Sequence, residues 1–413
     1  MQTLKHLSAS SILCVLLLVP APASAIDGND VFCQNAPIVQ GQLDWLMDVF
    51  AGKAPGLERY VARFNRKLVN LCVRMNELQV IGSHNSYHVE PIPELIDLFL
   101  MFDPEAIAWE YTHPPLAFQF EAQGIRQIEL DVFADPDGGL YANRIALSLI
   151  GQPIESNEPA LDEPGFKVLH VQHADFDTTC LTFVACLEQV KAWSDANPGH
   201  LPIMILVEAK DTGFFEPILP PVVEIDAALF RELDAEILSV FPEERILLPD
   251  DVRRGYATLE EAVLDRGWPT VGKVRGKVMF GLDNGGAKSA VYRDGADSLE
   301  GRILFTNATP GDPDAAFVKV NNPLGDPTLI PDLVSAGYVV RTRADSDTEQ
   351  ARTGDVTQRD AALASGAQWV STDYADPDPR FGTGYSVELP GGGAGRCNPV
   401  LAPPLCRDEA VAP

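Results

Sequence analysis

Several apolar stretches of this chain end in side chains that could move protons or hold a cation. His84 and Asn85 follow the stretch 78–82, which indicates a buried strand that brings both residues to the edge of a sheet. A histidine can carry a proton near neutral pH, and an asparagine offers a hard carbonyl oxygen. A turn with a hydrogen-bonded imidazole would look the same, so the interpretation depends on how the other strands end.

Carboxylates occur in two of the other stretches. Glu129 and Asp131 lie two residues apart, so a strand would present both on one face, and Glu208 and Lys210 have the same spacing. With Asn85, the three carboxylates form a set of oxygen donors that favours Ca²⁺ over zinc or copper. The alternative is a network across neighbouring strands in which Lys210 pairs with the carboxylates.

Histidines end a further stretch, because His170 and His173 follow the apolar residues 166–169. Two histidines beside a calcium ion suit the cleavage of a phosphodiester. One histidine would deprotonate the nucleophile, and the other would protonate the leaving oxygen. His84 is one candidate; for the second, His170 is favoured over His173 because it directly follows the strand.

Basic residues at strand ends are candidates for contacts with a phosphate or a head group. Lys210, Arg341 and Arg343, together with Lys319, have this position in the sequence. Arginines at strand ends also pair with structural carboxylates, so both roles stay open.

The number and order of the apolar stretches predict the fold. Eight or nine short strands, several alternating with helical patterns, indicate an α/β protein with a (β/α)8 TIM-type barrel. Such a barrel carries its chemistry at the C-terminal ends of its strands. The expected strands are 78–84, 126–133, 166–172, 202–210, 277–284, 302–307, 316–321, 337–345 and 369–374. An open doubly wound sheet is the alternative, but no Gly-rich nucleotide loop follows any strand.

Four segments are expected along the chain. Residues 1–25 have the charge, apolar core and small-residue ending of a signal peptide cleaved near Ala25, and residues 26–77 form a helical extension. The barrel spans 78–376, and 377–413 is a Gly/Pro-rich tail.

A long insertion follows the first strand. Residues 88–124 are rich in proline and aromatic residues, and form either a lid or substrate wall or a helical insertion packed on its own aromatics. His88 and His113 lie in it and are expected to be structural or surface residues.

The cysteine content and the net charge limit the compartment in which the protein works and the partners that it can have. Six cysteines lie beyond residue 25, and an even number in an exported chain indicates disulfides rather than zinc. Local pairing suggests Cys33–Cys72, Cys180–Cys186 and Cys397–Cys406. The net charge of −28 argues against nucleic acid as a partner and against general attraction to anionic membranes. The expected location is secreted or periplasmic.

Five motifs in order resemble a known family. They are Ile81-Gly-Ser-His-Asn-Ser-Tyr87, Glu129-Leu-Asp131, Val168-Leu-His170, Val207-Glu-Ala-Lys210 and Val370-Ser-Thr-Asp-Tyr374. Over roughly 78–376 the chain is similar to the bacterial calcium-dependent phosphatidylinositol phospholipase C-like proteins, which share the barrel of the glycerophosphodiester phosphodiesterases.

The resemblance implies roles for individual residues. His84 would be catalytic, a histidine at the third strand end would be the second catalytic group, and Ca²⁺ would be bound by Asn85, Glu129, Asp131 and Glu208. The chain departs from the His-Gly-His of eukaryotic relatives, because it has His170-Val-Gln-His173 instead.

The implied function is an exported calcium-dependent phosphodiesterase that cleaves phosphatidylinositol or a related phospholipid. The aromatic insertion would make transient contact with the membrane surface, and no obligate protein partner is implied. The alternatives are a glycerophosphodiester phosphodiesterase that acts on deacylated substrates and an exported binding protein without turnover.

Overall fold

A parallel barrel forms the centre of the molecule in the computed structural model, which describes residues 28–49, 55–213 and 219–412. The expected signal peptide lies outside these residues. The barrel strands are β1 (Leu78–Ser83), β2 (Gln127–Phe133), β4 (Ile203–Ala209), β5 (Val278–Leu282), β6 (Leu304–Thr306), β7 (Phe317–Lys319), β8 (Val339–Arg343) and β9 (Trp369–Thr372). They are ordered β6-β5-β4-β2-β1-β9-β8-β7, and one parallel bridge between Asn307 and Phe317 joins β6 to β7. The predicted barrel is therefore confirmed as a nearly closed one.

The third expected strand is not part of the barrel. β3 (Lys167–Val168) has only two residues and pairs antiparallel with the end of β2, opposite Val132 and Phe133. β1 pairs with β2 only at Gln127, so the C-terminal part of β2 does not pair with β1. β3 pairs with that part of β2 instead. The expectation of a barrel strand over 166–172 was wrong, and His170 lies in the loop after β3.

Helices cover the outside of the barrel. They are α6 (Phe183–Ala196), α7 (Ala227–Val240), α8 (Pro249–Arg253), α9 (Leu259–Asp265), α10 (Val271–Val274), α11 (Ala287–Arg293), α12 (Leu329–Ala336), α13 (Glu349–Thr353) and α14 (Thr357–Ala364). Gly354 ends α13 with a φ of +75° and separates it from α14. Such a left-handed residue is a common helix stop, and glycine adopts it without strain.

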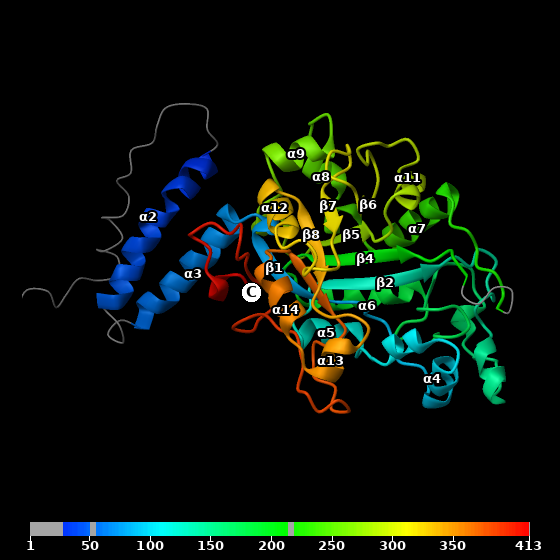
Figure 1. Ribbon diagram of the computed structural model, residues 1–413. Coiled ribbons are helices and arrows are strands. Elements are labelled where there is room, and N and C mark those ends of the chain that lie inside the picture. The colour runs from blue at the N-terminus through cyan, green and yellow to red at the C-terminus, as the bar shows by residue number, and fades with distance from the viewer. Residues whose placement is uncertain (1–27, 50–54, 214–218, 413) are drawn as a thin grey trace, which may run out of the picture.

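The N-terminal extension consists of α2 (Gly28–Val49) and α3 (Pro55–Cys72), joined by the disulfide Cys33–Cys72. Both helices lie at the end of the barrel where the strands begin (Figure 1), and α3 packs against α10. The extension is thus remote from the strand ends that carry the polar residues.

The insertion after β1 contains α4 (Pro93–Leu100), a 3₁₀ helix (Pro104–Trp109) and α5 (Leu116–Glu121). Leu95, Phe99 and Trp109 belong to a small apolar cluster outside the main core, which residues of later loops such as Ala146 and Phe176 complete. The 3₁₀ helix also lines a cavity at the barrel mouth. Both interpretations of the insertion therefore hold in part.

The C-terminal tail is held to the bottom of β1. β10 (Arg396–Cys397) pairs antiparallel with Leu78 and Gln79. The disulfides Cys397–Cys406 and Cys180–Cys186 form as predicted. Among the described residues, no helix is long and apolar enough to cross a membrane.

Candidate active site

A cavity of about 690 Å³ opens at the C-terminal end of the barrel, and we call it the catalytic cavity. Its wall includes two of the three predicted catalytic histidines, His84 and His170. Residues 103–109 and Tyr111 come from the insertion, and the remaining lining residues come from the end of β8 and from the loops that follow β1, β3, β8 and β9. The fold thus brings together groups that lie far apart in the sequence.

His84 is oriented by a carboxylate. His84 follows β1 directly. Its Nδ1 lies 2.8 Å from Oδ1 of Asp373, the residue that follows β9. Arg343 donates to Oδ2 of the same carboxylate at 2.9 Å. A donor Nδ1–H leaves Nε2 as the proton acceptor. Burial and then Arg343 lower the pKa of His84, although Asp373 opposes them, so the imidazole is neutral near pH 7.

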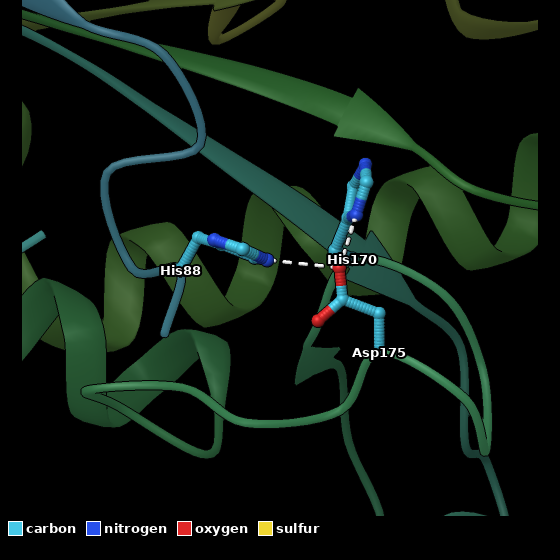
Figure 2. A group of neighbouring side chains, drawn as sticks. All are labelled: His88, His170 and Asp175. Carbon is cyan, nitrogen blue, oxygen red and sulfur yellow. Dashed lines mark hydrogen bonds and ion pairs between the residues drawn. The ribbon is translucent and has the colours of Figure 1, made fainter. Parts of the chain in front are cut away.

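His170 is held in a similar way, as Figure 2 shows. Oδ2 of Asp175 lies 2.7 Å from Nδ1 of His170 and 2.8 Å from Nε2 of His88. Burial, more than any other effect, lowers the pKa of His170. His170 therefore has Nδ1 tied to a carboxylate and Nε2 available for proton transfer, as His84 has.

His88 is a buried cation beside His170. Its Nδ1 lies 2.9 Å from the carbonyl oxygen of Tyr111, and its Nε2 faces Asp175, so both ring nitrogens must donate. Burial lowers the pKa of His88, but Asp175 and the Tyr111 carbonyl raise it by more. Of the roles expected for His88 the structural one holds: it fixes Asp175. His113, also buried, faces the carbonyl of His84 at 2.8 Å.

His173 lies away from the cavity. Its Nδ1 is 2.9 Å from the carbonyl oxygen of Asn143, and its ring stacks on Tyr141 at 5.8 Å. It is not among the residues that line the catalytic cavity. The structure therefore separates His170 from His173, which the sequence left open.

Three carboxylates meet inside the barrel. Oxygens of Glu129, Glu208 and Asp283 lie within 4.8 Å of one another. Arg341 donates to Glu129 at 2.6 Å across the barrel interior, and Lys319 pairs with Asp283. Burial raises the pKa of Glu129 to about 7, although Arg341 opposes this. The other two residues proposed from sequence, Asn85 and Asp131, lie outside this group of three.

Asn85 and Asp131 nevertheless have unused oxygens. Asn85 donates through Nδ2 to the hydroxyl of Tyr111 at 3.0 Å, while its Oδ1 is buried without a partner. Oδ1 of Asp131 is buried without a partner as well. An unsatisfied buried acceptor costs about 1–3 kcal/mol. Such oxygens, in a set made only of carboxylates and an amide, fit a calcium ion.

The lysine network expected as the alternative is also present. Lys210 Nζ lies 3.0 Å from Oδ2 of Asp131 and 3.1 Å from Oε2 of Glu208. Its single charge faces two carboxylates. The two interpretations are therefore compatible, because the remaining oxygens stay free to bind a cation.

The predicted head-group contacts divide into two classes. Arg343 lines the catalytic cavity. Arg341 is 1% exposed and bonded to Glu129 and Asn321, so it belongs to the barrel interior. Lys210 is bonded to the carboxylates.

Sequence reasoning missed the residues that hold the histidines in place. Asp373 ends a strand, as the other candidates do, and that position could have identified it. Asp175 and Tyr111 lie in loops, where residue type and spacing give no such signal.

Comparison with known proteins identifies the family. The model of the family described as "Phosphoinositide phospholipase C, Ca²⁺-dependent" matches residues 73–399. None of the curated proteins matches the chain. Among solved structures, the chain is similar to a calcium-dependent phosphoinositol-specific phospholipase C from Pseudomonas sp., with 16% identity, coverage of 78% of this chain and 95% of that chain, and a TM-score of 0.48.

A second similar structure is a Ca²⁺-dependent phosphatidylinositol-specific phospholipase C from Streptomyces antibioticus, with 19% identity, coverage of 73% and 95%, and a TM-score of 0.46. Because the family model spans most of the sequence, this chain belongs to the Ca²⁺-dependent phosphoinositide phospholipase C family and is a phosphodiesterase with a calcium cofactor.

Proposed function

We propose that this protein is an exported phosphodiesterase that cleaves phosphatidylinositol by acid–base catalysis with two histidines. One observation carries the proposal: His84 and His170, each held by a buried carboxylate, line the same cavity beside a set of oxygen donors.

His84 is the general base in this proposal. Its Nε2 takes the proton of the inositol 2-hydroxyl while that oxygen forms its bond to phosphorus. Asp373 keeps Nδ1 protonated and stabilises the imidazolium that forms. The neutral state favoured by burial suits a base, because the lone pair is available at neutral pH.

His170 is the general acid. In the productive state its Nε2 carries a proton, a state that Asp175 favours and burial opposes. This proton passes to the diacylglycerol oxygen as the bond from that oxygen to phosphorus breaks. Asp175 orients the ring, and His88 holds Asp175 in place. The products are a cyclic inositol phosphate and diacylglycerol, and the protonation states of the two histidines are exchanged.

The calcium ion would be held by Asn85, Glu129, Asp131 and Glu208, with the Asp283 carboxylate beside Glu129 and Glu208. When bound, the cation supplies positive charge for the phosphoryl oxygens and the attacking hydroxyl. Arg343 is placed to contact the substrate, because it lines the cavity.

Exposed apolar side chains near the catalytic cavity support transient membrane contact. Met101 is 78% exposed, Phe102 71% and Leu149 59%. Phe102 and Leu149 line an apolar hollow of about 300 Å³ together with Phe99, which packs edge-on against Trp109 in the wall of the catalytic cavity. An apolar surface beside the active site favours a lipid substrate over a deacylated one.

Export is supported by the three disulfides among the described residues, which persist in oxidising compartments. Retention of two carboxylate-held proton carriers argues for turnover rather than binding alone.

A substrate panel tests the proposal. Vesicles of phosphatidylinositol, vesicles of phosphatidylcholine and soluble glycerophosphoinositol should each be assayed with calcium and with a chelator. We expect calcium-dependent turnover of phosphatidylinositol, with a cyclic inositol phosphate as the first product in phosphorus NMR. Preference for glycerophosphoinositol would support the deacylated-substrate alternative, and no turnover of any substrate would support a binding protein.

A further inference from the structure

A second hollow, of about 360 Å³, lies at the opposite end of the barrel from the catalytic cavity. It is lined by residues of α8, α10 and their neighbouring loops, including Lys277, which directly precedes β5. His84 follows the C-terminal end of β1. Because the barrel strands are parallel, the two hollows open at opposite ends of the molecule.

The lining of this hollow has the opposite charge to the rest of the chain. Four cations, Arg254, Arg266, Lys273 and Lys277, face it with a single carboxylate, Asp251. The whole chain has 59 acidic residues against 31 lysines and arginines. From the composition alone, more acidic than basic residues would be expected around this hollow. The excess of basic residues is therefore a local feature of the hollow.

Most of these cations lack a strong acidic partner. Within the described part of the chain, the side chains of Arg266 and Lys273 have no hydrogen-bond or ion-pair partner. Lys277 Nζ lies 4.0 Å from Asp251, and Arg254 Nε donates to the backbone carbonyl of Asp251 at 2.8 Å. The single carboxylate therefore cannot neutralise the group.

The backbone of Arg254, one of the lining residues, has an unfavourable conformation. Arg254 ends α8 with a φ of +54°, where glycine is the usual residue, and Gly255 is its neighbour. The left-handed region costs a residue with a side chain about 1–2 kcal/mol. Burial, then Arg266 and Arg74, lower the pKa of Arg254, and Asp251 opposes them.

We propose that this hollow is a second binding site, distinct from the catalytic cavity, that takes a phosphate-bearing anion. Arginine guanidinium groups match the oxygens of a phosphate in pairs, and lysines add charge without fixing a direction. A soluble phosphate compound and the head group of an anionic lipid offer the same chemistry, so the experiment has one arm for each.

The first arm is calorimetric titration of the mature protein with inorganic pyrophosphate in the presence of a calcium chelator. The second is sedimentation with vesicles of phosphatidylglycerol, compared with phosphatidylcholine. The double variant Arg266→Gln with Lys273→Gln removes the two unpaired charges, and Arg231→Gln, exposed on α7, is the control for a general loss of charge. Thermal unfolding checks that each variant is folded.

We expect the double variant to weaken binding at least about tenfold and to make it less dependent on salt, while Arg231→Gln binds as the wild type does. If the double variant binds only pyrophosphate more weakly, the ligand is a soluble phosphate compound. If it binds only the vesicles more weakly, the ligand is a lipid head group. Weaker binding of both supports the shared chemistry. Absence of wild-type binding in both arms, or equal binding by the double variant in both, would overturn the proposal.

Arg254→Gly gives an independent test that does not risk unfolding. Glycine relieves the backbone strain, so the midpoint of thermal unfolding should stay the same or rise, while binding in the responsive arm should weaken. Undiminished binding by this variant would remove Arg254 from the site and contradict the account of its conformation.

Discussion

At the residue scale, the protein places two imidazoles in one cavity and uses a carboxylate to hold Nδ1 of each. Asp373 and Asp175 have the same task, one for each histidine. Asp175 has a second partner in His88, whose charge compensates the buried carboxylate. Asp373 could have been identified from its position directly after β9, whereas Asp175 lies in a loop, where residue type and spacing give no such signal.

The support of His170 leads to a prediction. Asp175→Asn should lower turnover by about 10–100-fold, because the neutral amide lacks the negative charge that His88 and His170 both face. The loss should fall on kcat more than on KM, since binding contacts remain. Steady-state kinetics on phosphatidylinositol vesicles measure this. An equal loss from Asp135→Asn, a buried carboxylate paired with Lys167 and absent from the cavity wall, would point to a merely structural effect.

The same carboxylate makes stability depend on pH. Burial would raise the pKa of Asp175, but His88 and His170 outweigh it and hold the pKa at about 2. A folded-state pKa below the unfolded value of about 3.9 means that stabilisation is present above about pH 4 and is lost as pH falls through about 2. The difference in free energy of unfolding between wild type and Asp175→Asn should therefore shrink by roughly 2 kcal/mol from pH 5 to pH 2. A difference independent of pH would contradict the assigned pKa.

The calcium ligands can be tested singly. Asp131→Asn and Glu129→Gln should weaken calcium binding strongly in calorimetry, because each removes a charged donor. Asp283→Asn is informative, since its oxygen lies within 4.8 Å of those of Glu129 and Glu208 although the sequence did not propose it as a ligand. Undiminished calcium binding by both Asp131→Asn and Glu129→Gln would exclude the two residues from the metal shell.

At the element scale, the insertion between β1 and β2 has two functions. Its apolar side chains form a small cluster outside the main core together with residues of later loops, and its 3₁₀ helix supplies part of the cavity wall. Its outermost apolar side chains are Met101 and Phe102, whereas Trp109 is only 9% exposed. The insertion therefore exposes apolar side chains without losing its packing against the rest of the molecule.

That surface predicts a difference between substrates. Met101→Ser with Phe102→Ser should reduce turnover of phosphatidylinositol in vesicles much more than turnover of a soluble, short-chain substrate. The physical reason is that each exposed apolar side chain gains free energy only where it leaves water for lipid. Ile38→Ser, an exposed apolar site on α2, is the control. Equal losses on both substrates would show that the segment is purely structural.

At the scale of the whole molecule, the barrel was predictable because its strands are buried on both faces and read as continuous apolar runs. Within β2 the apolar run is interrupted by Gln127 at its start and by Glu129 and Asp131, where the site lies. The error at β3 arose because a two-residue antiparallel strand and a barrel strand share the same apolar signal. Contacts between loops, such as His88 with Asp175, depend on tertiary packing and leave no period in the sequence.

Three disulfides cross-link the described part of the chain. Thiol titration of the denatured, unreduced mature protein should find almost no free thiols, because the six cysteines beyond residue 25 are paired. Each bond can contribute about 2–4 kcal/mol. Reactive thiols at any one pair would contradict that pairing.

The central claim is that His84 and His170 perform the proton transfers and that His173 does not. Turnover of phosphatidylinositol vesicles by His84→Ala, His170→Ala and His173→Ala tests it most directly. The account predicts losses of about 10²–10⁴-fold in the first two variants, with calcium affinity and thermal unfolding retained, and turnover close to wild type in the third. Near-normal turnover by His84→Ala, or a severe loss confined to His173→Ala, would contradict it.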